Sequence, residues 1–280
     1  MIEILKPGFF STIQDLGRNG YRNLGVPISG AMDQHSSKLA NALLGNDPKD
    51  AVIEVTLTGP VIKFTCSTAI CITGAQMRPK INEEPLPLNQ KTIVIKGDVL
   101  SFGKLEFGFR SYIAISGGIQ VPMIMNSRSM YTNITSDSRL RTGDILEIKE
   151  EQEALTSSFA TIKYNRDHFK NSILETHKGP EFELLPDALQ EELKTKNFTI
   201  SKNNNRMGYQ LVETLENDLP SILTAPVLPG TVQLTPSGKL IALMRDGQTS
   251  GGYPRVLQLS NEAINILAQK KAGDKVRLLC

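Results

Sequence analysis

The sequence predicts a mainly β protein, built from barrels or sandwiches with a few short helices. Short apolar or alternating runs, bounded by glycine, proline and asparagine, recur along the whole chain. Strands this short and numerous favour barrels or sandwiches over a doubly wound parallel sheet. The strands are expected at residues 52–57, 61–65, 69–73, 99–102, 111–116, 145–148, 172–176, 232–234, 240–244, 256–259 and 275–279.

Helix signals are few. Asp33 is expected to cap a helix whose apolar residues recur at helical spacing and which ends at Gly45. A second short helix is expected to open at Asp187, and a third at Asn261, before Gly273. Three short helices among many strands are typical of a β-dominated fold.

The chain carries weak internal similarity that suggests two tandem domains. A length of 280 residues allows two domains of ordinary size. Each of the three matching pairs of segments is near chance, and Gly143-Asp144 resembles Gly273-Asp274 as well as Gly97-Asp98 does. Duplication of a domain therefore stays open at this point. We expect a first domain at 1–155 and a second at 156–280, with the polar segment 150–167 as linker. The matches are Arg18-Asn-Gly-Tyr-Arg with Arg206-Met-Gly-Tyr-Gln, Gly59-Pro-Val with Gly230-Thr-Val, and Gly97-Asp98 with Gly273-Asp274.

Composition excludes several classes of protein. The 31 lysines and arginines against 29 aspartates and glutamates leave a net charge of +2, too small to hold nucleic acid by charge alone. Cys66, Cys71 and Cys280 have no repeated spacing, which argues against a disulfide framework or zinc ribbon and for a reducing cytoplasm. The N-terminal residues lack a signal peptide, and four prolines interrupt the uncharged stretch 219–238, so we expect no membrane partner.

Common catalytic motifs are absent from the sequence. No Gly-x-x-x-x-Gly-Lys-Ser/Thr loop is present to bind phosphates, so ATP, if used, requires a site supplied largely by another chain. The Gly-x-Ser-x-Gly pattern of α/β serine hydrolases is also missing. His35, His168 and His177 are isolated from one another and from any cysteine pair, so we predict no metal site.

The first polar cluster comprises residues 12–18 and 25–33, where polar side chains stand beside glycines that permit tight turns. Arg18 could hold a carboxylate with its planar guanidinium, and Asp15 could orient a reacting amide. Gln14 and Ser29, in the same segments, are predicted to bind substrate. Two structural alternatives stay open, because Asp15 and Arg18 could pair with each other and Asp33 could serve only as a helix cap.

The second polar cluster, residues 244–254, directly follows an apolar strand. Asp246 and Thr249 are predicted to be catalytic, and Gln248 and Tyr253 to bind substrate. The glycines at 251 and 252 let backbone approach a ligand. The alternative is an elaborate turn in which Asp246 bonds its own backbone. Arg206, in one of three lesser candidate segments (108–112, 126–129 and 205–209), is a further predicted substrate ligand.

Several of these segments resemble a known family of carboxyltransferase domains, also described as carboxyltransferase subdomain C-D or allophanate hydrolase subunit 2. The family includes KipA-like proteins and PxpC, a component of the bacterial ATP-dependent 5-oxoprolinase. The resemblance spans nearly the whole chain in family order. The segments are Thr12-Ile-Gln-Asp-Leu-Gly-Arg, Gly25-Val-Pro-Ile-Ser-Gly-Ala-Met-Asp, Ala40-Asn-Ala-Leu-Leu-Gly-Asn, Ser116-Gly-Gly-Ile, Asn205-Arg-Met-Gly-Tyr and Asp246-Gly-Gln-Thr-Ser-Gly-Gly-Tyr-Pro.

The resemblance implies two tandem cyclophilin-like β-barrels that work with a PxpB or KipI-like chain and a PxpA-like chain. The implied reaction opens the ring of 5-oxoproline to give glutamate at the expense of ATP, with magnesium. In that reaction Arg18 or Arg206 would hold the substrate carboxylate, while Asp15, Asp246 and Thr249 would position the lactam.

Two other functions are compatible with the shared motifs. The chain could be a KipA-like regulator that binds a KipI-type kinase inhibitor and has no catalytic role. It could instead be the carboxyltransferase half of a biotin-dependent urea or amide carboxylase. Biotin would then arrive on another protein, because no Met-Lys attachment context occurs in this sequence.

Overall fold

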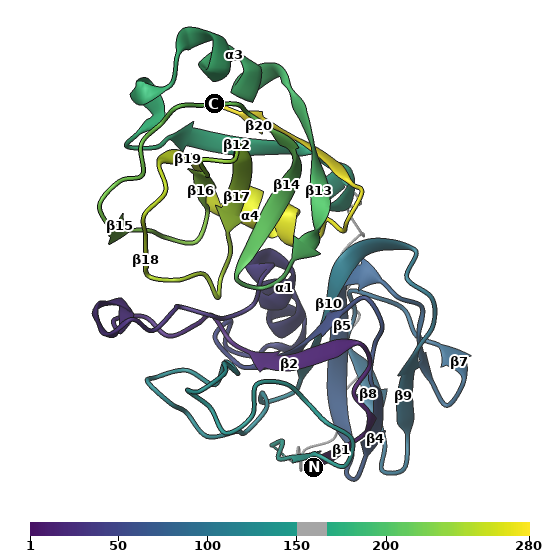
Figure 1. Cartoon of the computed structure of the whole chain (residues 1–280). Helices are drawn as coiled ribbons and strands as arrows, with labels where there is room; N and C mark the ends of the chain where they lie inside the picture. The colour runs from purple at the N-terminus through teal and green to yellow at the C-terminus, as the bar shows by residue number, and fades with distance from the viewer. Residues whose placement is uncertain (150–166) are drawn as a thin grey trace. The chain divides into compact units, whose positions relative to one another are not determined.

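The computed structural model describes residues 1–149 and 167–280, which pack into two compact units (Figure 1). The first unit contains Met1–Arg18 and the described part of Ser29–Arg166. The second contains Asp167–Cys280 together with a short segment from the N-terminal region, Asn19–Ile28.

The first unit contains two antiparallel sheets, labelled in Figure 1. The six-stranded sheet has the order β11 (Ile145–Leu146), β1 (Ile2–Lys6), β4 (Val61–Phe64), β9 (Val99–Phe102), β6 (Pro79–Ile81) and β7 (Glu84–Pro85). The five-stranded sheet has the order β2 (Phe10–Gln14), β3 (Val52–Thr56), β10 (Phe107–Ile115), β5 (Thr68–Gln76) and β8 (Thr92–Val94).

One apolar core joins these two sheets. Buried side chains from the six-stranded sheet, such as Ile4 and Phe64, belong to the same cluster as Ile53 and Ile113 from the five-stranded sheet. Alternate residues of each strand point to opposite faces, so every second residue enters this core. The other face of the five-stranded sheet packs against helix α1 (Gln34–Leu44) through a smaller apolar cluster that includes Tyr112.

The second unit is a closed barrel of seven strands. Its cyclic order is β12 (Ile173–Lys178), β19 (Arg255–Leu259), β16 (Thr231–Leu234), β17 (Lys239–Leu243), β14 (Gly208–Thr214), β13 (Asn197–Asn204) and β20 (Lys275–Leu279). The parallel pairing of β20 with β12 closes the barrel, and the other neighbours are antiparallel. Closure leaves the barrel without open sheet edges.

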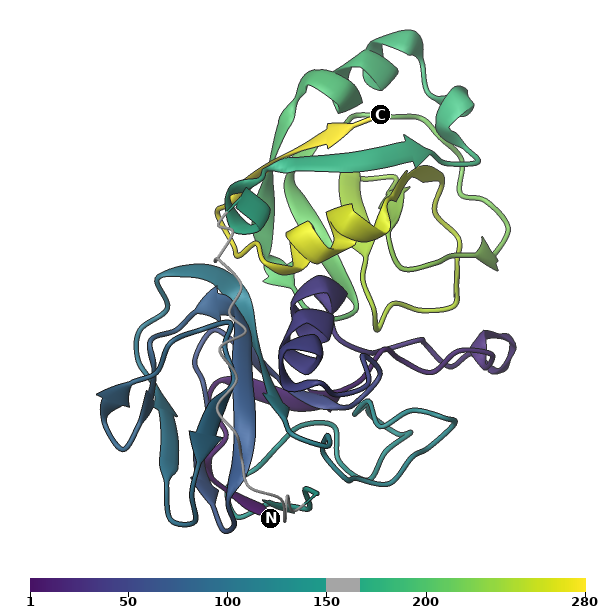
Figure 2. The ribbon, with the colours of Figure 1, turned by 180° about the vertical axis from the view of Figure 1, so that it is seen from behind.

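Short helices and a small ribbon complete the second unit. Helix α4 (Asn261–Ala268) packs against β12 and β19, and Figure 2 shows it in yellow beside the barrel. The remaining helices are α2 (Asp167–Lys170), α3 (Asp187–Thr195) and the 3-10 turns η1 (Arg22–Leu24) and η2 (Phe182–Leu184). Strands β15 (Ala225–Pro226) and β18 (Ser250–Gly251) pair as a two-stranded ribbon.

The predicted mainly β architecture with a few short helices is confirmed. All three expected helices are present, and Asp33 caps α1 by accepting a hydrogen bond from the Ser36 amide at 3.1 Å. Of the two barrels that the resemblance implies, the second unit is closed, while the first unit divides its strands between two sheets. The expected division at 155/156 and the linker 150–167 lie outside the described residues, apart from Asp167. The inclusion of Asn19–Ile28 in the second unit was not expected.

The Gly-Asp matches correspond to a real structural repeat, but one that does not distinguish the two units. Before β20, the Gly273 amide donates to the Ile200 carbonyl and the Ile200 amide donates to the Asp274 carbonyl. Gly97-Asp98 makes the same pair of bonds with Phe64, and Gly143-Asp144 makes it with Ile4. Because the turn occurs twice in the first unit, it gives no specific support for duplication, which stays a prediction.

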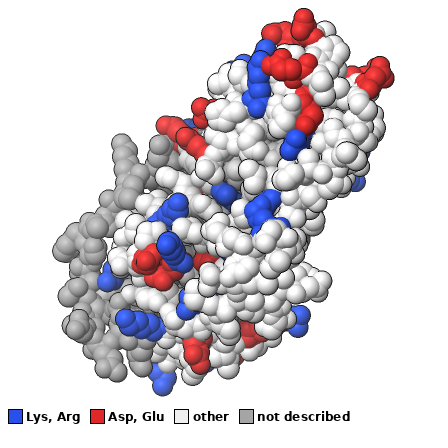
Figure 3. All heavy atoms as spheres, turned by 90° about the vertical axis from the view of Figure 1, so that its left-hand side faces the viewer, with Lys and Arg blue, Asp and Glu red and all other residues white. Residues whose placement is uncertain are grey.

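Charge on the protein surface is mixed. On the face drawn in Figure 3, lysine and arginine side chains stand among aspartates and glutamates. None of the helices in the described ranges is both long enough and apolar enough to cross a membrane. The three cysteines are free thiols, and burial raises the pKa of Cys71 to about 12, which keeps this thiol protonated and unreactive.

Candidate functional site

Asp15 lies at the end of β2 and organises a distant loop. Its carboxylate is buried, with 7% of the residue exposed, and its hydrogen-bond donors among the described residues are all uncharged. The donors are the amides of Gly17 (2.7 Å) and Arg128 (2.6 Å) and the hydroxyls of Ser127 (2.7 Å) and Ser129 (2.6 Å). The four donors satisfy the hydrogen-bonding capacity of this buried carboxylate. The contacts show Asp15 fixing residues 127–129, and its predicted catalytic role stays a prediction.

The other predicted residues of the first cluster are buried around the same turn. Arg18 is fully buried and donates to the Ser129 carbonyl at 2.5 Å. Gln14 and Ser29 are also fully buried, and the Gln14 Oε1 and Ser29 Oγ atoms have no hydrogen-bond partner in the described part of the chain. A buried polar atom that lacks a partner costs about 1–3 kcal/mol, so Gln14 and Ser29 are candidate contacts for a water or a ligand.

A close backbone crossing holds this turn together. Gly30 has a φ of +85°, and a Cβ atom there would lie 2.7 Å from the Gly17 nitrogen. The Ala31 amide donates to the Asp15 carbonyl at 2.8 Å across the same crossing. Only glycine fits such a position, because a side chain would both clash with backbone and strain φ. The glycines of the two sequence segments therefore bring residues 14–18 and 29–31 together.

The second cluster is built around an ion pair. Arg206 donates to both carboxylate oxygens of Asp246, with Nε–Oδ2 at 2.7 Å and a guanidinium nitrogen to Oδ1 at 3.1 Å. Both residues are buried, each with 7% exposed. The Asp246 amide also donates to the Arg206 carbonyl at 2.8 Å. The structure thus joins two segments that are 40 residues apart, and the alternative of a purely local turn at Asp246 is wrong.

Beyond Asp246 the loop becomes accessible. Gln248 and Ser250 are exposed, Thr249 is half-buried, and 41% of Tyr253 is exposed. The β15–β18 ribbon fixes the backbone here, since Ser250 pairs with Pro226 and the Val227 amide donates to the Thr249 carbonyl at 3.1 Å. A rigid backbone that carries accessible amide, hydroxyl and phenol groups is suited to binding a small polar ligand.

Arg22 bonds to this loop from a distant segment, and sequence reasoning did not predict its contribution. It belongs to the segment Asn19–Ile28, and its guanidinium donates to the carbonyl oxygens of Val227 and Thr249. One guanidinium nitrogen, Nη1, is buried without a hydrogen-bond partner among the residues described, and burial lowers the pKa of Arg22. Arg22 lies in the segment 18–22, which is one of the segments of the weak internal similarity. Its contact with Thr249 could not be predicted, because the two residues are far apart in sequence.

A second missed group lies on the helix-facing side of the five-stranded sheet in the first unit. Glu54 accepts hydrogen bonds from the Met32 amide at 2.7 Å and the Tyr112 hydroxyl at 3.0 Å, and its carboxylate is 3.8 Å from Arg110 Nε. Burial, with the nearby Glu54 and Asp33 carboxylates, raises the pKa of Tyr112 well above its ordinary value. The available signal was an acidic residue inside an apolar strand, Val-Ile-Glu-Val-Thr.

Within residues 1–149 and 167–280, groups of three or more His, Cys, Asp or Glu side chains that could hold a metal ion do not occur. ATP and magnesium stay predictions for a complex.

Comparison with known proteins places the chain in a family. The model of the carboxyltransferase domain, subdomain A and B, matches residues 24–279, so the matching subdomain pair is A and B and not C and D. The C component of the Escherichia coli 5-oxoprolinase is 29% identical over 100% of this chain and 91% of its own length. The C component of the Haemophilus influenzae 5-oxoprolinase is 31% identical over 99% of this chain and 90% of its length.

A solved structure gives the same assignment. The crystal structure of the K. lactis urea amidolyase superposes with a TM-score of 0.88 at 27% identity. The similarity covers 99% of this chain but only 18% of that much longer protein. On the evidence of the family model and of full-length relatives, the chain belongs to the carboxyltransferase domain family, subdomain A and B.

Proposed function

We propose that this chain is the PxpC component of an ATP-dependent 5-oxoprolinase, which hydrolyses 5-oxo-L-proline to L-glutamate together with PxpB-like and PxpA-like chains. The supporting observation is the extent of the matches. Two relatives named as the C component of a 5-oxoprolinase align over about nine tenths of their own length, whereas the urea amidolyase aligns over 18% of its chain. A match that extends over most of a C component supports a PxpC-type function more strongly than a match to a small part of a urea amidolyase.

In this proposal the loop 246–253 binds the lactam. The Arg206–Asp246 pair and Arg22 position the loop, because their polar groups bond to this chain's own atoms. Gln248, Thr249 and Tyr253 contact the substrate, because they are the accessible groups. An amide and a hydroxyl at hydrogen-bond distance from a lactam would orient it and stabilise charge that develops on its carbonyl oxygen.

Reconstitution with the two partner chains tests the proposal. We expect glutamate release from 5-oxoproline only when all chains and magnesium ATP are present. Gln248→Ala should lower kcat/KM by about 100-fold, the usual effect of removing one transition-state hydrogen bond. Asp218→Asn, an exposed substitution in the same unit, should leave activity unchanged. Failure of the complete mixture to release glutamate would reject the function, while full activity of Gln248→Ala would reject only the loop's role.

Carboxyl transfer is the second candidate, and the similarity to a urea amidolyase favours it. The same loop would then bind urea, which also presents an amide nitrogen beside a carbonyl. The test is transfer of the carboxyl group from a carboxylated biotin carrier to urea. Detection of carboxylated urea without glutamate release in the first assay would replace the first proposal with this one.

A further inference from the structure

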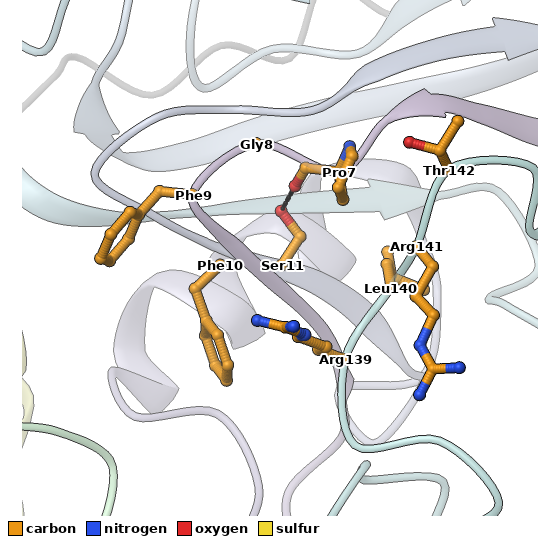
Figure 4. A pocket seen from close by; sticks show the side chains of 9 residues that line it. All are labelled: Pro7, Gly8, Phe9, Phe10, Ser11, Arg139, Leu140, Arg141 and Thr142. Carbon is orange, nitrogen blue, oxygen red and sulfur yellow. Dashed lines mark hydrogen bonds between the residues drawn. The ribbon is translucent and has the colours of Figure 1, made fainter.

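A cavity of about 240 Å³ opens in the first unit, and none of its lining residues belongs to either polar cluster. Figure 4 shows its walls, formed by residues 7–11, which follow β1 and include the start of β2, and by residues 139–142. Its lining includes two arginines and two phenylalanines, and no acidic residue. The volume is just below the usual range of ligand sites, which suits a small molecule.

The walls of this cavity are fixed by local hydrogen bonds. The Ser11 hydroxyl donates to the Pro7 carbonyl at 2.6 Å, and the Phe9 amide donates to the Thr58 hydroxyl at 2.8 Å. On the opposite wall the Leu140 amide donates to the Ser11 carbonyl at 2.8 Å, and the Leu140 side chain is buried. The two walls are therefore held together before any ligand arrives, which lowers the entropic cost of binding.

Gly8 allows the first wall to turn. Its φ is +72°, and a Cβ atom at this position would lie 2.4 Å from the Thr58 carbonyl oxygen. The turn leaves 64% of Phe9 exposed to solvent beside the cavity. Phe9, on a backbone fixed by these bonds and adjacent in sequence to Phe10, provides an apolar surface for a ligand.

The charge in the cavity comes from Arg139. Its guanidinium points into the cavity toward Phe10 in Figure 4, and it makes no hydrogen bond or ion pair with any residue in the described ranges. Arg141 differs, because its guanidinium points away from the cavity in the same view and lies 3.9 Å from the Asp137 carboxylate. One solvent-exposed positive charge, whose donors are not bound by any described residue, thus faces an apolar wall.

We propose that this cavity binds a small carboxylate with a flat apolar body. The carboxylate accepts two hydrogen bonds from the planar Arg139 guanidinium, whose donors match its geometry. The flat body packs against the phenylalanine side chains. This inference does not rest on the proposed function, since the cavity shares no residue with the loop 246–253.

Benzoate is the probe that tests the site. It is titrated into the isotope-labelled full-length chain, and binding is followed through the backbone amide signals of Gly8, Phe9 and Thr142 by NMR. We expect saturable shifts at these amides. Arg139→Gln should raise the dissociation constant at least about fivefold, through loss of the charged two-bond contact. Arg141→Gln removes the same charge from a lining residue whose guanidinium points away from the cavity, and it should change the dissociation constant less than about twofold. Acetate, which has the carboxylate without the ring, should bind at least about fivefold more weakly than benzoate.

Other outcomes would overturn the proposal. Equal weakening by the two arginine variants would mean general charge attraction, and shifts that do not saturate would mean that no site exists. Equal binding of acetate and benzoate would remove the apolar part of the site. If Arg139→Gln does not fold, Arg139→Lys keeps the charge and loses the planar fork. Unchanged benzoate binding by that variant would also overturn the proposal.

Discussion

Asp15 in the first unit and Asp246 in the second are buried to the same extent but are stabilised in different ways. Asp15 accepts from two backbone amides and two serine hydroxyls, all uncharged, whereas Asp246 forms a two-bond ion pair with Arg206. Each carboxylate joins two segments that are far apart in sequence. The comparison shows that a buried aspartate can organise a loop through neutral dipoles or through one opposite charge, and the two solutions should respond differently to mutation.

The largest loss of stability is expected from breaking the ion pair between Arg206 and Asp246. Arg206→Ala leaves the Asp246 carboxylate buried without its counter-charge, which should lower the free energy of unfolding by about 3–5 kcal/mol. Urea denaturation followed by circular dichroism measures the change. Arg277→Ala, an exposed arginine of β20 in the same unit, is the control and should change stability by about 0.5 kcal/mol or less. Equal effects of the two variants would show that the pair does not carry the stability of this cluster.

Removing the charge at Asp15 should lower the free energy of unfolding by less than Arg206→Ala does. In Asp15→Asn one carboxylate oxygen becomes an NH2 group, which cannot accept from its former donor, so about 1–3 kcal/mol should be lost. The partly exposed Asp137→Asn in the same unit is the matched control. The same urea experiment applies, and a loss as large as that of Arg206→Ala would contradict the distinction between neutral and ionic stabilisation.

Arg22→Ala tests how the segment Asn19–Ile28 contributes to the second cluster. It removes the donors to the Val227 and Thr249 carbonyls, and we expect a loss of about 1–2 kcal/mol. Hydrogen exchange at the Val227 amide, which donates to Thr249, should become faster because the ribbon opens more often. Exchange at the Val232 amide in the barrel should stay unchanged. If both amides accelerate equally, the effect is on the whole barrel.

The smallest change in stability is expected at a second ion pair of the second unit, between Arg255 and Glu181. This pair is more exposed than Arg206–Asp246, so it should contribute less. Arg255 donates to Glu181 through two nitrogens, and this hydrogen bonding lowers the pKa of Glu181. Because the pKa of Glu181 is lower in the folded state than in the unfolded state, its ionised form contributes to the free energy of unfolding above the unfolded pKa of about 4.3. This contribution is lost as the pH falls through the folded pKa.

The stability difference between the wild type and Glu181→Gln should therefore be about 1 kcal/mol at pH 7 and should shrink between about pH 5 and pH 3. Urea denaturation at several pH values measures it. Lys178 and Glu183, an exposed pair nearby, provide the control, and Glu183→Gln should show little pH-dependent difference. A constant difference across this range would contradict the linkage to Glu181.

Local pattern was enough to predict secondary structure at many positions. The expected strand 52–57 and the observed β3 differ by one residue, because a short apolar run with β-branched residues has few alternatives. The Asp33 cap was also predictable, since the cap and the helix it starts are adjacent in sequence. Strands β13 and β14 were not predicted from the sequence, because polar residues in the runs 197–204 and 208–214 weaken the alternation of apolar residues.

The sequence by itself determined the β class, the helix starts, the glycine turns and the family motifs, because each depends on neighbouring residues or on short spacings. Only the tertiary structure decided which polar groups meet. Arg206 reaches Asp246, Asp15 reaches residues 127–129, and Arg22 reaches Thr249 through contacts spanning 40 to 227 residues of sequence. Sheet register and barrel closure set such contacts, and no local pattern encodes the register between strands that are distant along the chain.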